Sequence, residues 1–119
     1  MSHEGGHRHQ RLQQLIEEEL TSLLRDEVQD PRLEDVRIIG VTLSIDYKSA
    51  RVRYVVPDES RANLSKVQRA FERAAPFLRA RLGEALDLKK LPTLSFLFDR
   101  DAAAGARAVS ILEEKPKSE

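Results

Sequence analysis

The chain contains 119 residues, of which 40% are hydrophobic and 34% are charged, a composition that fits one globular domain with its own core. It has no cysteine, which excludes disulfide bonds, thiolate catalysis, iron–sulfur clusters and cysteine-ligated zinc. No apolar run approaches the roughly 20 residues needed to cross a bilayer, and the polar N-terminus does not resemble a signal peptide, so we expect a soluble, cytoplasmic protein.

The formal net charge of zero conceals a segregation of charge along the chain. Residues 1–35 carry four basic and nine acidic side chains, whereas residues 60–92 carry eight basic and three acidic ones, a net charge of +5. Such a local excess fits a surface that faces an anionic partner, although charged residues on helices commonly serve only to keep a face solvated. The sequence therefore indicates one basic surface, built from the middle of the chain.

The N-terminal segment is predicted to be a flexible arm followed by a long helix. Residues 1–7 are polar, contain two glycines and offer no periodic apolar position. From Leu12 to Val28 the apolar residues follow one another at steps of three, one and four, which predicts an amphipathic helix over residues 8–28. Asp30-Pro31 ends this helix, because the residue before a proline is disfavoured in the helical conformation.

Two β-strands follow as a predicted hairpin. The first strand covers residues 36–46, and its apolar residues alternate on one face at Ile39, Val41, Leu43 and Ile45. Val36 and Ile38 fall in the opposite phase, which predicts a β-bulge near Gly40. The second strand covers residues 49–56, and one of its faces consists of Ala50, Val52, Tyr54 and Val56.

The middle of the chain is predicted to form two helices that meet at a kink. A stripe of apolar residues at helical spacing runs from Leu64 to Leu86. Pro76 interrupts this stripe, and a proline inside a helix costs about 3 kcal/mol, whereas a proline at a first helical position is well tolerated. We therefore expect helices over residues 61–75 and 76–87, joined at Ala75-Pro76.

The last predicted elements are a strand and a helix. Leu94, Phe96 and Phe98 alternate as a third strand, and the alanine-rich stretch after Asp99 predicts a further helix. A single domain is expected over residues 8–113, with residues 114–119 as a flexible tail. The order α-β-β-α-α-β-α predicts an α+β fold in which the helices cover one face of a three-stranded sheet.

The residues give an enzyme hypothesis little support. All the histidines lie in the N-terminal segment, at His3, His7 and His9, so the commonest acid–base group is missing from the predicted fold. The acidic cluster on the first helix, at Glu17, Glu18 and Glu19, is typical of a solvated face. The sequence contains no phosphate-binding or dinucleotide-binding glycine motif. We therefore predict no catalytic residue, no metal site and no cofactor.

The basic residues favour a binding function instead. Lys66, Arg69 and Arg73 are spaced three and four apart, which places them on one helix face, away from Val67 and Phe71. The wider set of candidate RNA-binding residues adds Arg79, Arg81, Lys89 and Lys90 from the following segment and Arg51 and Arg53 from the hairpin. Each of these residues taken alone is more simply explained as solvated, but the set as a whole fits contact with phosphates.

Aromatic side chains on which bases could stack are scarce. There are two tyrosines and four phenylalanines, and all the phenylalanines, Phe71, Phe77, Phe96 and Phe98, are assigned to the core. This composition favours contacts with phosphates and with folded RNA shape over the recognition of single-stranded bases.

Several sequence segments, taken in order, carry a family resemblance. They are RDEVQDPRL at Arg25–Leu33, SIDYKSARVRYVV at Ser44–Val56, RAAPFLRARL at Arg73–Leu82, LPTLSFLFD at Leu91–Asp99 and GAR at Gly105–Arg107. With these segments the chain resembles the bacterial ribosome-binding factor A family over about residues 8–113.

The resemblance implies a K-homology-like fold of type II, α-β-β-α-kink-α-β with a C-terminal helix. It also implies a non-enzymatic, monomeric assembly factor that binds the immature small (30S) ribosomal subunit and assists late maturation of 16S rRNA, including its 5′ end. In that family a helix–kink–helix with an Ala-x-Gly pattern replaces the usual Gly-x-x-Gly loop. Ala74, Ala75 and Pro76 match this pattern, with proline in place of glycine. The alternative is a K-homology-like RNA-binding or adaptor domain with a different RNA or protein target.

Overall fold

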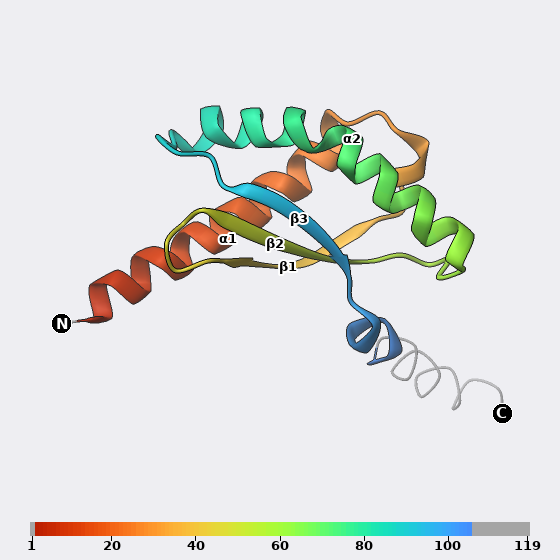
Figure 1. Cartoon of the computed structure of the whole chain (residues 1–119), viewed down its shortest axis with the longest axis horizontal. Helices are drawn as coiled ribbons and strands as arrows, with labels where there is room; N and C mark the ends of the chain where they lie inside the picture. The colour runs from red at the N-terminus through yellow and green to blue at the C-terminus, as the bar shows by residue number, and fades with distance from the viewer. Residues whose placement is uncertain (1, 106–119) are drawn as a thin grey trace, which may run out of the picture.

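The computed structural model describes residues 2–105 of the chain, with side chains from His7 onward. The elements in chain order are α1 (Ser2–Asp26), the short 3-10 helix η1 (Pro31–Leu33), β1 (Arg37–Leu43), β2 (Ser49–Val55), α2 (Arg61–Leu86) and β3 (Thr93–Phe98). A further helix begins at Arg100 and is described as far as Gly105 (Figure 1). The rest of the predicted C-terminal helix and the predicted tail, residues 114–119, lie outside the described residues.

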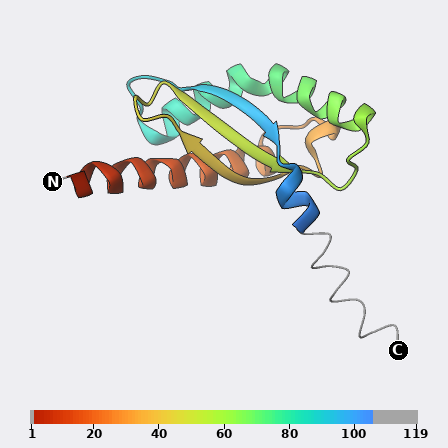
Figure 2. The same cartoon turned by 60° about the horizontal axis from the view of Figure 1, so that its bottom comes forward.

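The first helix begins earlier than its apolar pattern indicated, at Ser2 and not near Arg8. Its first turns extend past the end of the sheet (Figures 1 and 2). A helix can continue in this way without packing, because each residue added to an existing helix gains one hydrogen bond. His9 reaches the hairpin turn, where its Nε2 lies 3.2 Å from the carbonyl oxygen of Ser44. The flexibility of residues 1–7 stays a prediction.

The three strands form one mixed sheet in the order β1-β2-β3, with β1 antiparallel to β2 and β2 parallel to β3. The predicted β-bulge near Gly40 is confirmed, because Ile38 pairs with Tyr54 and Gly40 with Arg53, which leaves one extra residue in β1. The placement of Ile39 and Ile45 on one face with Val41 and Leu43 was wrong, because the extra residue at the bulge brings Ile38 into the core in place of Ile39. The strand ends at Leu43, and Ile45 lies in the turn with 90% of its surface exposed.

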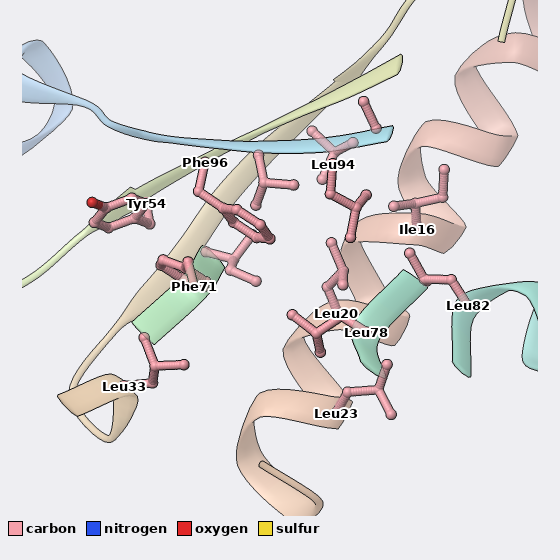
Figure 3. Packing of buried hydrophobic residues seen from close by; sticks show 14 of the residues in the cluster. Ile16, Leu20, Leu23, Leu33, Tyr54, Phe71, Leu78, Leu82, Leu94 and Phe96 are labelled. Carbon is pink, nitrogen blue, oxygen red and sulfur yellow. The ribbon is translucent and has the colours of Figure 1, made fainter. Parts of the chain in front are cut away.

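The core lies between one face of the sheet and the two long helices. The predicted inner face of β2 is confirmed, since Ala50, Val52, Tyr54 and Val56 are all buried. The helices contribute buried residues to the same cluster, among them Ile16, Leu20 and Leu23 from α1 and Phe71, Leu78 and Leu82 from α2 (Figure 3). The opposite face of the sheet is exposed at Thr42, Arg51, Ser95 and Leu97. The predicted arrangement is therefore confirmed for the described helices α1 and α2, which both pack on one face of the sheet.

Aromatic rings join α2 to the sheet. Phe71 stacks on Phe96 with ring centroids 4.2 Å apart and also contacts Tyr54 at 4.9 Å. The Tyr54 hydroxyl donates a hydrogen bond to Gln68, whose amide nitrogen donates in turn to the carbonyl oxygen of Phe96. Burial raises the pKa of the Tyr54 hydroxyl above its ordinary value. These contacts fix the rotation of α2 about its axis and so decide which residues face solvent.

The prediction of two helices joined at Pro76 was wrong, because α2 is one helix that contains Pro76. The ribbon of α2 changes direction along its length (Figure 1). Proline removes the N–H that would have bonded to the carbonyl of Glu72, and its ring pushes that carbonyl away, but both residues are exposed, so water can reach the carbonyl. Phe71 and Leu78 meanwhile hold the turns on either side of Pro76 in the core. The helix therefore bends instead of ending.

Candidate nucleic-acid interface

The first half of α2 carries three of the predicted basic residues on its outer surface. Lys66, Arg69 and Arg73 are all exposed, whereas Val67 and Phe71 are buried against the sheet. The spacing of three and four residues places these cations on one side of the helix, as the sequence indicated. We call Lys66, Arg69 and Arg73 the basic face.

The basic face has no internal counter-charge in direct contact. Within residues 7–105, none of its three side chains forms an ion pair or a side-chain hydrogen bond. Arg73 acts on Asp30 only from a distance: the pKa of Asp30 is lowered mainly by a hydrogen bond from Arg32, with a smaller coulombic contribution from Arg73. Lys66 likewise acts on Asp58 only through space, as the last and smallest cause of the lowered pKa of Asp58. None of the three charges is held in a direct pair, so each can attract an external anion.

The second half of α2 uses its arginines differently. Arg79 donates from Nε to the carbonyl oxygen of Pro92 and from Nη2 to that of Leu91, both at 2.9 Å. Arg81 joins α2 to the end of α1, with its Nη1 2.7 Å from one oxygen of Glu27 and its Nη2 donating to the other at 3.0 Å. Both guanidinium groups are thus engaged by the fold, although the sequence grouped them with the RNA-binding candidates.

The two hairpin arginines lie on the open face of the sheet, which is the side turned away from α2. Arg51 is exposed there without an ion pair to another described residue. Arg53 lies over Gly40, where a Cβ atom would clash with the guanidinium, and its Nη1 is 3.6 Å from Asp99. Arg51 and Arg53 therefore do not extend the basic face.

Lys89 and Lys90 are exposed in the loop between α2 and β3. The N–H of Thr93 donates to the carbonyl oxygen of Lys48 at 2.9 Å, so this loop meets the hairpin turn at one end of the sheet. The nine predicted residues thus occupy separate surfaces: the outer side of α2, the loop end and the open sheet face. Lys48, which the sequence analysis did not single out, is exposed at the loop end.

The predicted kink motif lies at the bend of α2. Ala74 and Ala75 are half-buried, and Pro76 is exposed. The bend separates the basic face from Arg79 and Arg81.

Phe77 is the functional candidate that the sequence analysis missed. It was expected in the core, but 41% of its surface is exposed. The Arg81 guanidinium lies over one face of its ring, with Cζ 5.7 Å from the ring centroid. Helical spacing alone gave no clear signal, since Phe77 lies four residues after Arg73 but also seven after the buried Ala70, between the basic face and the core.

The described part of the chain contains no group of three or more His, Asp or Glu side chains placed to hold a metal ion.

An open groove runs between the end of α1, η1 and the start of β1, where Leu24, Val28 and Arg37 are among its lining residues. Across residues 2–105, no helix is both long and apolar enough to cross a membrane.

Comparison with known proteins identifies the family. A family model described as ribosome-binding factor A matches residues 8–112. The chain belongs to this family. The family member from Ruthia magnifica is 39% identical over 114 residues, covering 96% of this chain and 99% of that protein. The one from Heliobacterium modesticaldum is 41% identical over 111 residues, covering 92% and 90%.

Solved structures of ribosome-binding factor A share the fold. The crystal structure of the Thermus thermophilus factor matches with a TM-score of 0.66 and 27% identity, covering 75% of this chain and 93% of that one. A homology model of the T. thermophilus factor, fitted into a cryo-EM map of its 30S complex, matches with a TM-score of 0.55 and 30% identity, covering 72% and 93%. These likenesses confirm the predicted α+β, K-homology-like fold.

Proposed function

We propose that this protein is a non-enzymatic assembly factor that binds the immature 30S ribosomal subunit through its 16S rRNA. In this role it assists late maturation of the rRNA, including the processing of its 5′ end. Membership of the ribosome-binding factor A family supports a ribosomal target, and the T. thermophilus factor has been fitted into a map of a 30S complex. The observation that carries the proposal is the basic face, three exposed cations without an internal ion pair among the described residues.

The chemistry of this contact is electrostatic. Each cation of the basic face that meets a phosphate displaces condensed counterions from the RNA, which supplies affinity without reading sequence. Lys89, Lys90, Arg51 and Arg53 lie on other surfaces, so in this proposal they contact other segments of the folded rRNA. Arg79 and Arg81 act indirectly, by fixing the loop and the helix that carry the contact residues.

Sedimentation of cell extract, with detection of the protein across the subunit fractions, tests the proposal. The wild-type protein is expected with immature 30S particles and not with mature subunits or bulk RNA. Reversing the basic face, Lys66→Glu, Arg69→Glu and Arg73→Glu, should remove it from those fractions while leaving the fold intact, because exposed substitutions usually change stability by less than about 0.5 kcal/mol. Cells that carry only this variant should accumulate 16S rRNA with an unprocessed 5′ end.

The matched control reverses three exposed arginines scattered over other elements, Arg11, Arg37 and Arg100. It changes the net charge by the same amount, so a surface that acts only through net charge would lose binding equally in both variants. If the scattered variant stays in the immature 30S fractions and the basic-face variant does not, the contact lies at the basic face. Equal binding of the wild type to mature subunits or to bulk RNA would contradict the proposal and favour a K-homology-like domain with another RNA target.

A further inference from the structure

Phe77 differs from the other phenylalanines of this chain in its surroundings. Phe71, Phe96 and Phe98 belong to a chain of ring contacts with Tyr54 in and around the core. Phe77 makes no ring contact with any described residue, and 41% of its surface is exposed. A ring with 41% of its surface exposed keeps part of its apolar area available to a partner outside the core.

The groups beside Phe77 are planar or cationic. The Arg81 guanidinium lies 5.7 Å from the ring centroid, and Glu27 holds both of its terminal nitrogens, which fixes its orientation. Arg73, without an ion pair in the described chain, lies one helical turn before Phe77 on the same side of α2. Because Glu27 neutralises Arg81, the uncompensated charge next to the ring is that of Arg73.

We propose that Phe77 is a stacking platform for an unstacked base of single-stranded RNA, with the Arg81 guanidinium packed over one face of the ring to hold it in place and Arg73 binding the adjacent phosphate. Protein sites for unstacked bases use these groups, namely aromatic rings for the base and cations for the backbone. Charge complementarity selects RNA over an apolar protein segment, since the ring lies one helical turn after Arg73 of the basic face. The inference rests on the proposed function and adds that the RNA segment at α2 is a loop, bulge or end.

Affinity for a single-stranded RNA and for its perfect duplex, measured at several salt concentrations with the full chain, tests the platform. Loss of one base-stacking contact weakens binding by about 5- to 150-fold. Phe77→Ala and Phe77→Leu should both show such a loss for the single strand, with little change for the duplex. The slope of log affinity against log salt should stay at the wild-type value, because no phosphate contact is removed. Leu97→Ala, a half-exposed apolar residue on the open sheet face, is the matched control.

The absence of tryptophan from the chain gives a direct readout. Phe77→Trp introduces the only tryptophan of the chain, whose emission should be quenched when single-stranded RNA stacks on it, and this variant should bind at least as tightly as the wild type. Leu97→Trp should show no quenching. Normal binding by Phe77→Leu, or a Phe77→Trp emission that RNA leaves unchanged, would overturn the platform. If the Phe77 variants bind normally while neutralising the basic face abolishes binding, only this inference fails; if neither change matters, the proposed function fails as well.

Discussion

On one side of Pro76, α2 presents Lys66, Arg69 and Arg73 to solvent without a direct ion pair in the described chain. On the other side, Arg79 donates to two loop carbonyls and Arg81 is held by Glu27 of α1. Both halves of α2 carry exposed or half-exposed basic side chains. Only those of the first half have no partner within the described protein that would compete with an external anion. A cation that already has a carboxylate or carbonyl partner must give it up before it can bind a phosphate fully, so it contributes less to binding.

Among the arginines of α2, the larger stability effects are expected in the second half of the helix. Arg79→Ala should lower the free energy of unfolding by about 1–2 kcal/mol, because two carbonyls lose a charged donor. Arg81→Ala should lower it by about 1 kcal/mol or less, since its ion pair is partly exposed. Urea unfolding measures both changes in the free energy of unfolding. In both variants the slope of log RNA affinity against log salt should keep its wild-type value.

The complementary experiment replaces a basic residue in the first half of α2, with the variant Arg69→Ala. The free energy of unfolding should change by less than about 0.5 kcal/mol. The slope of log RNA affinity against log salt should flatten by roughly 0.7–0.9, because one phosphate contact is lost. If Arg81→Ala flattened the slope and Arg69→Ala did not, the assignment of free and engaged cations would be reversed.

Replacing the residue between the two halves should have a smaller effect. Pro76→Ala restores a backbone N–H and permits a straighter helix, but Phe71 and Leu78 still hold both sides of the bend on the core, so the protein should fold. A straighter α2 would change the direction in which the basic face points relative to Phe77, so affinity for immature subunits should fall several-fold. Ala80→Ser, an exposed change one turn further on, is the control. Affinity equal to the wild type in Pro76→Ala would mean that the bend only serves packing.

The smallest expected effect is a shift in the pKa of Asp30, which can be followed by NMR titration. Its folded pKa lies below the ordinary 3.8, chiefly because Arg32 donates a hydrogen bond to it and to a smaller extent because of Arg73. Arg32→Ala should therefore raise this pKa clearly, Arg73→Ala only slightly and Arg81→Ala not at all. Because the folded pKa is depressed, the stabilisation is present above pH 3.8 and is lost as the pH falls through the folded value. A large shift in Arg73→Ala would show that Arg73 is already paired.

Local patterns in the sequence determined most of the fold. The alternation of Ala50, Val52, Tyr54 and Val56 predicted the inner face of β2, and the change of phase after Ile38 predicted the bulge at Gly40. Both succeeded because strand periodicity depends only on neighbouring residues. The spacing of Lys66, Arg69 and Arg73 likewise predicted their common face, since helical periodicity is local too.

The tertiary structure decided the features that depend on distant residues. Arg81 meets Glu27, which is 54 residues away in sequence, and no local pattern reveals that its charge is neutralised. The exposure of Phe77 depends on how the contacts of Phe71 with the sheet fix the rotation of α2. The continuity of α2 through Pro76 depends on the core that holds both of its halves, because burial on the inner side outweighs one lost hydrogen bond on the solvent side.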